Sequence, residues 1–206
     1  MKLSKKTGRW LTALAVAFLA ILLLNLFDPT PIPSNEDKRG YTYQLSQARK
    51  EKDRFFQKSV QSPLHAKDRP LFHGLLYFPA DTAFRLLGLF ISQQETTHAS
   101  DEKTPAGKIQ FVYQRDTFLL TAFWSEKKEK QKYLFVPFRD ATSGEMTYGG
   151  GRYLDVPWTN DSHVLLDFNY AYNPYCAYNE TYVCTLPPAE NKLSFSVLAG
   201  EKKFHE

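Results

Sequence analysis

Apolar and polar residues alternate in two different ways along the chain, and the change falls near residue 62. Between Leu45 and Val60, apolar residues recur at helical spacing with charges between them, which predicts one amphipathic helix that ends before Ser62-Pro63. The rest of the chain breaks into short runs rich in aromatic and β-branched residues, separated by Asp, Gly, Pro, Asn or charge clusters. These runs are 71–79, 84–91, 108–114, 117–124, 132–138, 152–157, 163–171 and 193–200.

Eight short runs after one helix predict a mainly β domain, an antiparallel barrel or sandwich of about seven to eight strands. The three residues Gln114–Asp116 lie between two runs and predict a tight hairpin turn. The charged stretch Ser125–Lys132 predicts a longer, solvated hairpin tip, and Glu95–Gly107 predicts a polar loop.

The apolar run Trp10–Phe27 is uncharged, and all charged residues that precede it are basic. Its length is at the short end of what a membrane-spanning helix needs, about 17 to 25 residues. We therefore predict an N-terminal transmembrane helix with the N-terminus in the cytoplasm, so that the membrane is a partner and the domain is periplasmic or extracellular. A cleaved signal peptide is the alternative, although no small-x-small cleavage site follows the run.

The predicted organisation is a cytoplasmic tip and anchor over 1–27, a proline-rich linker over 28–40 and one exported domain over 41–206. The formal net charge is +4, and four basic residues, Lys2, Lys5, Lys6 and Arg9, account for it. Without them the chain has 22 basic residues (26 minus 4) and 22 acidic ones. A neutral body offers no basic stripe for a phosphate backbone, so nucleic-acid binding is not expected.

Cys176 and Cys184 are the only two cysteines, and both follow the predicted anchor. An even cysteine count outside the cytoplasm favours a disulfide, with free thiols as the alternative. A structural metal site would need more ligands than two sulfurs, and the five histidines are scattered. We expect no metal and no cofactor.

Two blocks of the chain concentrate polar and aromatic side chains, Arg139–Asp155 and Asp167–Asn179. One interpretation is a ligand site in which an arginine grips an anionic or polyhydroxylated group beside stacking tyrosines. The other is a network of Arg–carboxylate pairs that braces the fold. The candidate ligand-binding residues are Arg139, Asp140, Glu145, Tyr148, Arg152, Asp167, Asn169, Tyr170, Asn173 and Tyr175.

Several stretches occur together in one order: "SPL" at 62–64, "FHGLLYFP" at 72–79, the two blocks above, "PPAEN" at 187–191 and "GEK" at 200–202. In this combination the chain resembles the domain of unknown function 1684 family over roughly Tyr43 to Lys202. The resemblance implies a mainly bacterial protein, often exported or membrane-anchored, and it implies no particular activity.

Three functions are compatible with these residues. The first is binding of a small polar or sugar-like ligand or of a cell-envelope component. The second is a structural or assembly role in the envelope without a ligand. The third is an envelope hydrolase that uses two carboxylates among Asp140, Glu145, Asp155 and Asp167.

The glycine run Gly149–Gly151 predicts how the two blocks meet. A glycine bend would let the strand that begins at Arg152 closely approach the loop after Asp167. Arg152 would then lie near Asp167 or Asp140, with Tyr148, Tyr170 and Tyr175 as the pocket wall.

Overall fold

The computed structural model describes residues 35–93, 105–126 and 132–204. The chain divides into two units, Met1–Arg39 and Gly40–Glu206. Of the first unit, the structure describes only residues 35–39, which are the start of a helix. Everything that follows concerns the second unit.

Helix α2 spans Asn35–Lys58 and begins earlier than Leu45, so residues 35–40 of the predicted linker are helical. The predicted apolar side chains do face inward: Leu45 and Phe56 are buried. Phe56 packs with Leu64, Phe72 and Tyr178 in a cluster separate from the barrel core.

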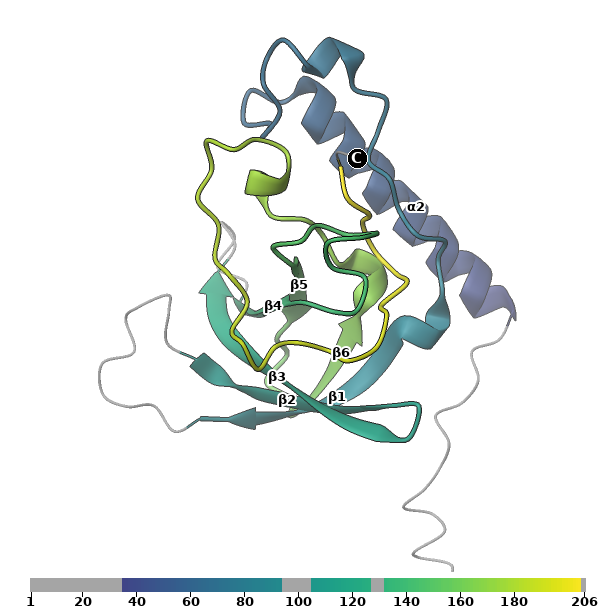
Figure 1. Ribbon diagram of the computed structural model, residues 1–206. Helices are drawn as coiled ribbons and strands as arrows, with labels where there is room; N and C mark the ends of the chain where they lie inside the picture. The colour runs from purple at the N-terminus through teal and green to yellow at the C-terminus, as the bar shows by residue number, and fades with distance from the viewer. Residues whose placement is uncertain (1–34, 94–104, 127–131, 205–206) are drawn as a thin grey trace, which may run out of the picture. The chain divides into compact units, whose positions relative to one another are not determined.

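Six strands form one antiparallel sheet in the order β5-β4-β3-β2-β1-β6 (Figure 1). Their bounds are β1 Arg85–Ser92, β2 Pro105–Tyr113, β3 Asp116–Glu126, β4 Lys132–Phe138, β5 Arg152–Pro157 and β6 His163–Asp167. Short 3₁₀ helices are η1 Arg69–Leu71, η2 Thr82–Phe84, η3 Phe168–Tyr170 and η4 Tyr175–Ala177. The sheet curls into a nearly closed barrel around a core that includes Ile109, Leu120, Leu134 and Leu166.

The barrel is completed at its open side by a single bridge rather than by a ladder. Tyr153 of β5 and Tyr172, which follows β6, exchange two backbone hydrogen bonds of 2.8 and 3.0 Å. The predicted tight turn is confirmed: Tyr113 pairs with Asp116, and Gln114 and Arg115 both have positive φ, as a two-residue hairpin loop of type I′ requires. Glu126 pairs with Lys132 across the second predicted hairpin.

The prediction of seven to eight strands is wrong, because the first and last of the eight runs are not strands of the sheet. Residues 71–79 and 193–200 form no strand of the sheet. The backbone N–H of Phe78 donates to the carbonyl oxygen of Gly200 at 2.9 Å, and Tyr77 forms an isolated bridge with Glu201, just after the last run. Apolar patterning alone does not distinguish a strand from an extended segment that covers a barrel. The backbone of Val197 and the carbonyl of Ala199 are hydrogen-bonded by side chains instead, as described below, while Leu193, Phe195 and Gly200 bond to backbone groups outside the sheet ladder.

The predicted anchor, Trp10–Phe27, lies outside the described residues. Within the described ranges that begin at Asn35, no helix is long and apolar enough to cross a membrane.

Candidate functional site

The two polar blocks do lie side by side. Gly151 has φ of +98°, and a Cβ at this position would lie 2.6 Å from the carbonyl oxygen of Phe138. Only glycine fits this bend, which directs β5 toward the segment after Asp167. The bridge between Tyr153 and Tyr172 joins the two blocks directly. The predicted approach of the blocks is therefore confirmed.

Arg152, the first residue of β5, is almost fully buried, with 1% of its surface exposed. Its Nη2 donates to Oδ2 of Asp140 at 3.1 Å and to the carbonyl oxygen of Val197 at 2.9 Å. Its Nη1 donates to the carbonyl oxygens of Ala199 and, at 3.1 Å, Glu201. Burial lowers the pKa of Arg152, and the carboxylate of Asp140 opposes this effect.

Asp140 is buried, and both of its carboxylate oxygens accept hydrogen bonds. Its Oδ2 also accepts the backbone N–H of Val197 at 2.7 Å, and its Oδ1 accepts the hydroxyls of Thr142 at 2.8 Å and Ser143 at 3.2 Å. Together, Arg152 and Asp140 hydrogen-bond the backbone of 197–201 as a neighbouring strand would. This is why the last apolar run needs no place in the sheet. The pair has little capacity left for a ligand.

Asp167 lies at the end of β6 and has other partners than Arg152. Nε of Arg85 donates to its Oδ2 at 3.0 Å, and the hydroxyl of Tyr41 donates to its Oδ1 at 2.8 Å. Nδ2 of Asn169 donates to the same Oδ1 at 3.0 Å. Burial and the charge of Asp167 raise the pKa of Tyr41 above its ordinary value. The predicted pairing of Arg152 is thus with Asp140, not with Asp167.

A third polar cluster, which the sequence did not indicate, surrounds Glu201. This residue is 1% exposed, and its Oε1 lies 2.5 Å from Nζ of Lys52 on α2. Its Oε2 accepts the hydroxyl of Tyr178 and the backbone N–H of Asn173, the latter at 2.9 Å. Glu201 belongs to the short "GEK" stretch, whose only sequence signal was its place in the family pattern. It ties α2 to the second block.

An aromatic cleft lies on the outer face of the barrel, with a volume of about 900 Å³. Side-chain alternation places Phe123 and Ser125 of β3, Tyr133 and Phe135 of β4 and Tyr153 of β5 there. The remaining lining residues are Trp124, Tyr172, Pro174, Tyr175, Tyr182, Val183, Cys184 and Thr185. Among the residues that the structure describes, the cleft lining includes no Lys, Arg, His, Asp or Glu.

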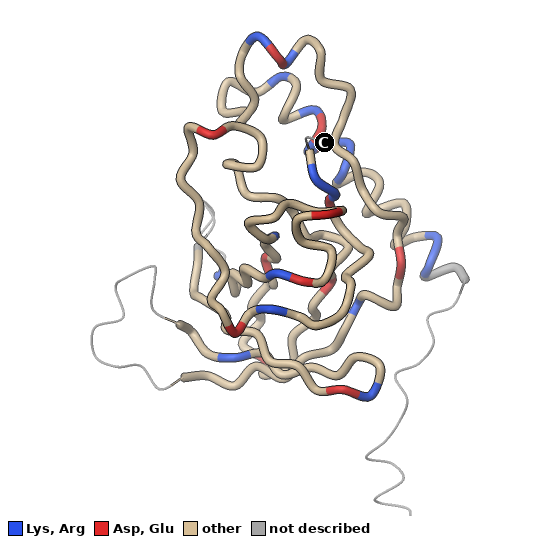
Figure 2. The backbone as a smooth tube through the Cα atoms, viewed as in Figure 1, with Lys and Arg blue, Asp and Glu red and all other residues tan. Residues whose placement is uncertain are grey.

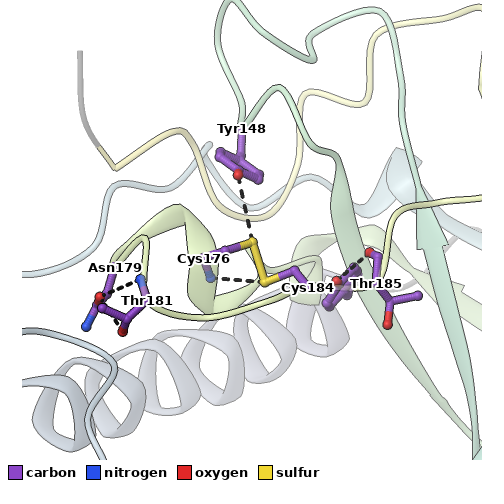
Figure 3. Close-up of a disulfide and its surroundings, with 7 residues drawn as sticks. Tyr148, Cys176, Asn179, Thr181, Cys184 and Thr185 are labelled. Atoms are coloured by element: carbon purple, nitrogen blue, oxygen red, sulfur yellow. Dashed lines mark hydrogen bonds between the residues drawn. A yellow bond between two sulfur atoms is a disulfide. The ribbon is translucent and has the colours of Figure 1, made fainter.

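The disulfide loop forms the second wall of the aromatic cleft. Cys176 and Cys184 are bonded, with their Cα atoms 6.0 Å apart, which confirms the predicted disulfide (Figure 3). The hydroxyl of Tyr148 donates to Sγ of Cys176 at 3.7 Å, and the hydroxyl of Tyr153 donates to the carbonyl oxygen of Thr185 at 2.6 Å. These contacts fix both ends of the loop against the barrel.

Thiol labelling tests this bond directly. Denatured, unreduced protein should contain no reactive thiol, and added reductant should expose two, because the chain has only Cys176 and Cys184. Removal of the bond should cost about 2.5 kcal/mol of stability, since the unfolded loop gains entropy. Labelling without reductant would contradict the pairing.

The ten candidate residues are dispersed over several environments. Only Tyr175 lines the aromatic cleft. Asn169 and Asn173 are buried and hydrogen-bonded within the protein, while Glu145 is exposed. Tyr170 is 42% exposed, and its pKa is raised by partial burial and by Asp167.

Arg139, the first residue of the first polar block, is half-buried and does not line the aromatic cleft. Nε of Arg139 is buried without a hydrogen-bond partner among the described residues. Phe123, Trp124, Tyr133 and Phe135 were predicted only as strand residues, because alternation does not reveal which outward face another segment will cover. Among the described residues, no group of three or more His, Cys, Asp or Glu side chains could hold a metal.

The fold and this site define a small, nearly closed, six-stranded antiparallel β-barrel with one helix and an aromatic cleft beside a disulfide loop. The chain belongs to the family described as "Protein of unknown function (DUF1684)", whose family model matches residues 71–202. It is similar to an uncharacterized protein of Haloarcula marismortui solved by solution NMR, with 36% sequence identity and a TM-score of 0.63. That match covers 82% of this chain and 97% of the other. No curated protein matches the chain.

Proposed function

We propose that this protein is a binding module that holds a neutral, sugar-like ligand in the aromatic cleft. The observation that carries this proposal is a cleft of about 900 Å³ walled by eight aromatic side chains and, within the described ranges, by no charged one. Ligand sites in proteins have volumes of about 300 to 1,000 Å³, so a small saccharide is a suitable size. The apolar faces of sugar rings pack on aromatic rings, while hydroxyls at their edges take hydrogen bonds.

The electrostatics of the cleft support a neutral ligand. Burial raises the pKa of Tyr153 to about 12, and burial also raises the pKa values of Tyr172 and Tyr175 above the ordinary tyrosine value. These phenols therefore stay protonated at physiological pH. Asp155 lies beside the cleft and accepts the hydroxyl of Tyr172 at 3.0 Å, so a negative charge there disfavours an anionic ligand. The described lining residues offer no ion pair, so the desolvation of an ionic ligand would not be offset.

We place this binding activity outside the cytoplasmic membrane, with the chain anchored by Trp10–Phe27. The apolar run is preceded by basic residues without any acid and followed by mixed charges, which supports an anchor with its N-terminus in the cytoplasm. The disulfide supports an oxidising compartment, because such bonds are rare in the cytosol. A saccharide component of the cell envelope would be within reach of a domain in this location.

The second candidate function is a structural role without a ligand, and the buried pair of Arg152 and Asp140 supports it. Arg152 and Asp140 are engaged with each other and with the backbone of 197–201, so these charges stabilise the fold. Binding and bracing are thus assigned to different residues. The hydrolase hypothesis has the weakest support, since none of Asp140, Glu145, Asp155 and Asp167 lines the aromatic cleft.

Substitution of two exposed tyrosines of the cleft, one just before the loop that Cys176 and Cys184 close and one within it, tests the proposed function. Tyr175 and Tyr182 are 40% and 38% exposed, and their rings contact each other edge to face at 5.4 Å. We expect Tyr175→Ala or Tyr182→Ala to weaken saccharide binding about tenfold, a loss of about 1.4 kcal/mol, because a stacking surface is removed. Saturation-transfer NMR with a panel of neutral mono- and disaccharides would measure it.

Tyr43→Ala is the matched control. Tyr43 is 65% exposed on α2 and does not line the aromatic cleft, so its removal should leave binding unchanged. Absence of binding for the whole panel, or equal binding by all three variants, would contradict the proposal.

A further inference from the structure

A second exposed surface lies on the outward side of β6, β1, β2 and β3 and is aliphatic. We call it the aliphatic face; its six members are 42% to 57% exposed. They are Leu87, Leu89 and Ile91 of β1, Leu165 of β6, Val112 of β2 and Leu119 of β3. Outward strand positions in a soluble barrel are usually polar, because they contact water.

The strand register makes the aliphatic face continuous. Leu87 lies opposite Leu165, and Leu89 lies opposite Gln110, which in turn lies opposite Leu119. Val112 is the diagonal neighbour of Leu119. Isolated exposed apolar side chains need no explanation, but a contiguous group of this kind marks an interaction surface.

The charged side chains on or beside this surface are few: Lys108, the Arg85–Asp167 pair, and Asp161, whose carboxylate lies 3.3 Å from Nδ1 of His163. Exposed Lys108 lies opposite Ile91, and His163 lies opposite Leu89. Among the described outward positions of these four strands the one acid is Asp167, which is ion-paired with Arg85. Figure 2 shows β1, β2 and β3 almost entirely tan along their lengths.

This composition fits a lipid surface better than a protein partner. A bilayer needs no matching shape, since insertion depends on apolar area and on attraction of basic side chains to anionic headgroups.

We infer that the aliphatic face contacts the surface of a bilayer that contains anionic lipid. The inference rests on the proposed membrane anchor, which keeps the domain beside a membrane. Leu87, Leu119 and Leu165 would enter the headgroup region, and Lys108 would meet lipid phosphate. The aromatic cleft takes no part in this contact.

A fluorescent probe in the full chain tests the contact. The native cysteines are disulfide-bonded, so Leu119→Cys creates a single free thiol for an environment-sensitive fluorophore. The labelled chain is inserted into nanodiscs of phosphatidylcholine and phosphatidylglycerol. We expect a shift of emission to shorter wavelength, and loss of emission when the acyl chains are brominated. Val60→Cys is the control: Val60 is 89% exposed and lies outside the aliphatic face, so its probe should keep its emission.

The double variant Leu87→Lys/Leu165→Lys, with the probe at position 119, should lose the effect. Both leucines are exposed, so the melting temperature should not change. Equal quenching at 119 and 60, quenching at neither, or retained quenching in the double variant would overturn the inference. A shift that depends on protein density and not on bromination would indicate a second copy of the chain and would overturn it too. A chain that fails to enter nanodiscs would refute the anchor itself, whereas unquenched but inserted chain refutes only the aliphatic face.

Discussion

Arg152→Lys is expected to lower the free energy of unfolding by about 3 kcal/mol, and Arg152→Met by about 3 to 5 kcal/mol. Lysine keeps the charge but cannot replace a planar guanidinium that donates to Asp140 and to three backbone carbonyls. Methionine leaves the Asp140 carboxylate buried without its partner. In a domain of this size the melting temperature should fall by on the order of 10 °C.

Thermal and denaturant unfolding measure this loss, with and without a saccharide. The expected loss is the same in both conditions, because Arg152 lies in the scaffold and not in the aromatic cleft. Arg139→Lys is the matched control, since Arg139 is only half-buried and forms no ion pair among the described residues. An Arg152→Lys variant with unchanged stability and weakened saccharide binding would reverse the assignment and make Arg152 a ligand residue.

Glu201→Ala is expected to cost a similar amount, about 3 to 5 kcal/mol. The carboxylate is buried and accepts from the backbone of Asn173 and the hydroxyl of Tyr178, while Lys52 neutralises its charge. Its removal leaves these donors without a partner and removes the ion pair between Lys52 of α2 and the buried carboxylate. The charge of Glu201 also raises the pKa of Tyr178, second to burial, so the variant should ionise Tyr178 at lower pH.

Denaturant unfolding at neutral pH gives the stability, and ultraviolet absorbance during alkaline titration gives the tyrosine ionisation. Glu180→Ala, an exposed acid in the disulfide loop, should change neither quantity. If Glu201→Ala and Glu180→Ala proved equally stable, the Glu201 cluster would not be part of what holds the fold together.

The elements that could be predicted from the sequence are those that depend on local patterns of residues. Helical spacing gave the amphipathic face of α2, with Leu45 and Phe56 buried. Alternation, turn residues and charge clusters located all six strands and both hairpins. Such signals suffice because a helix or a hairpin forms between residues that are near one another in the chain. The disulfide could also be predicted, since only one pairing of two cysteines exists.

The sequence alone could not place the ligand site, because the aromatic cleft is built from residues far apart in the chain. Phe135 of β4 and Tyr182 of the disulfide loop become two walls of one cleft only after the loop folds over the barrel. The sequence marked Arg152 as a candidate, but its role depended on its partners: Asp140 and the carbonyls of 197–201 accept from both Nη atoms.

By itself the sequence determined the helix, the strands, the turns and the disulfide of this protein, because local periodicity and covalent chemistry fix them. Tertiary structure alone decided that Val197 and Ala199 of the last apolar run would be hydrogen-bonded by side chains instead of by a strand. It also decided that the charged block would be scaffold and that the outward aromatic rings would form a cleft. Burial and hydrogen-bond partners belong to the packed molecule, and they set what each of these side chains can do.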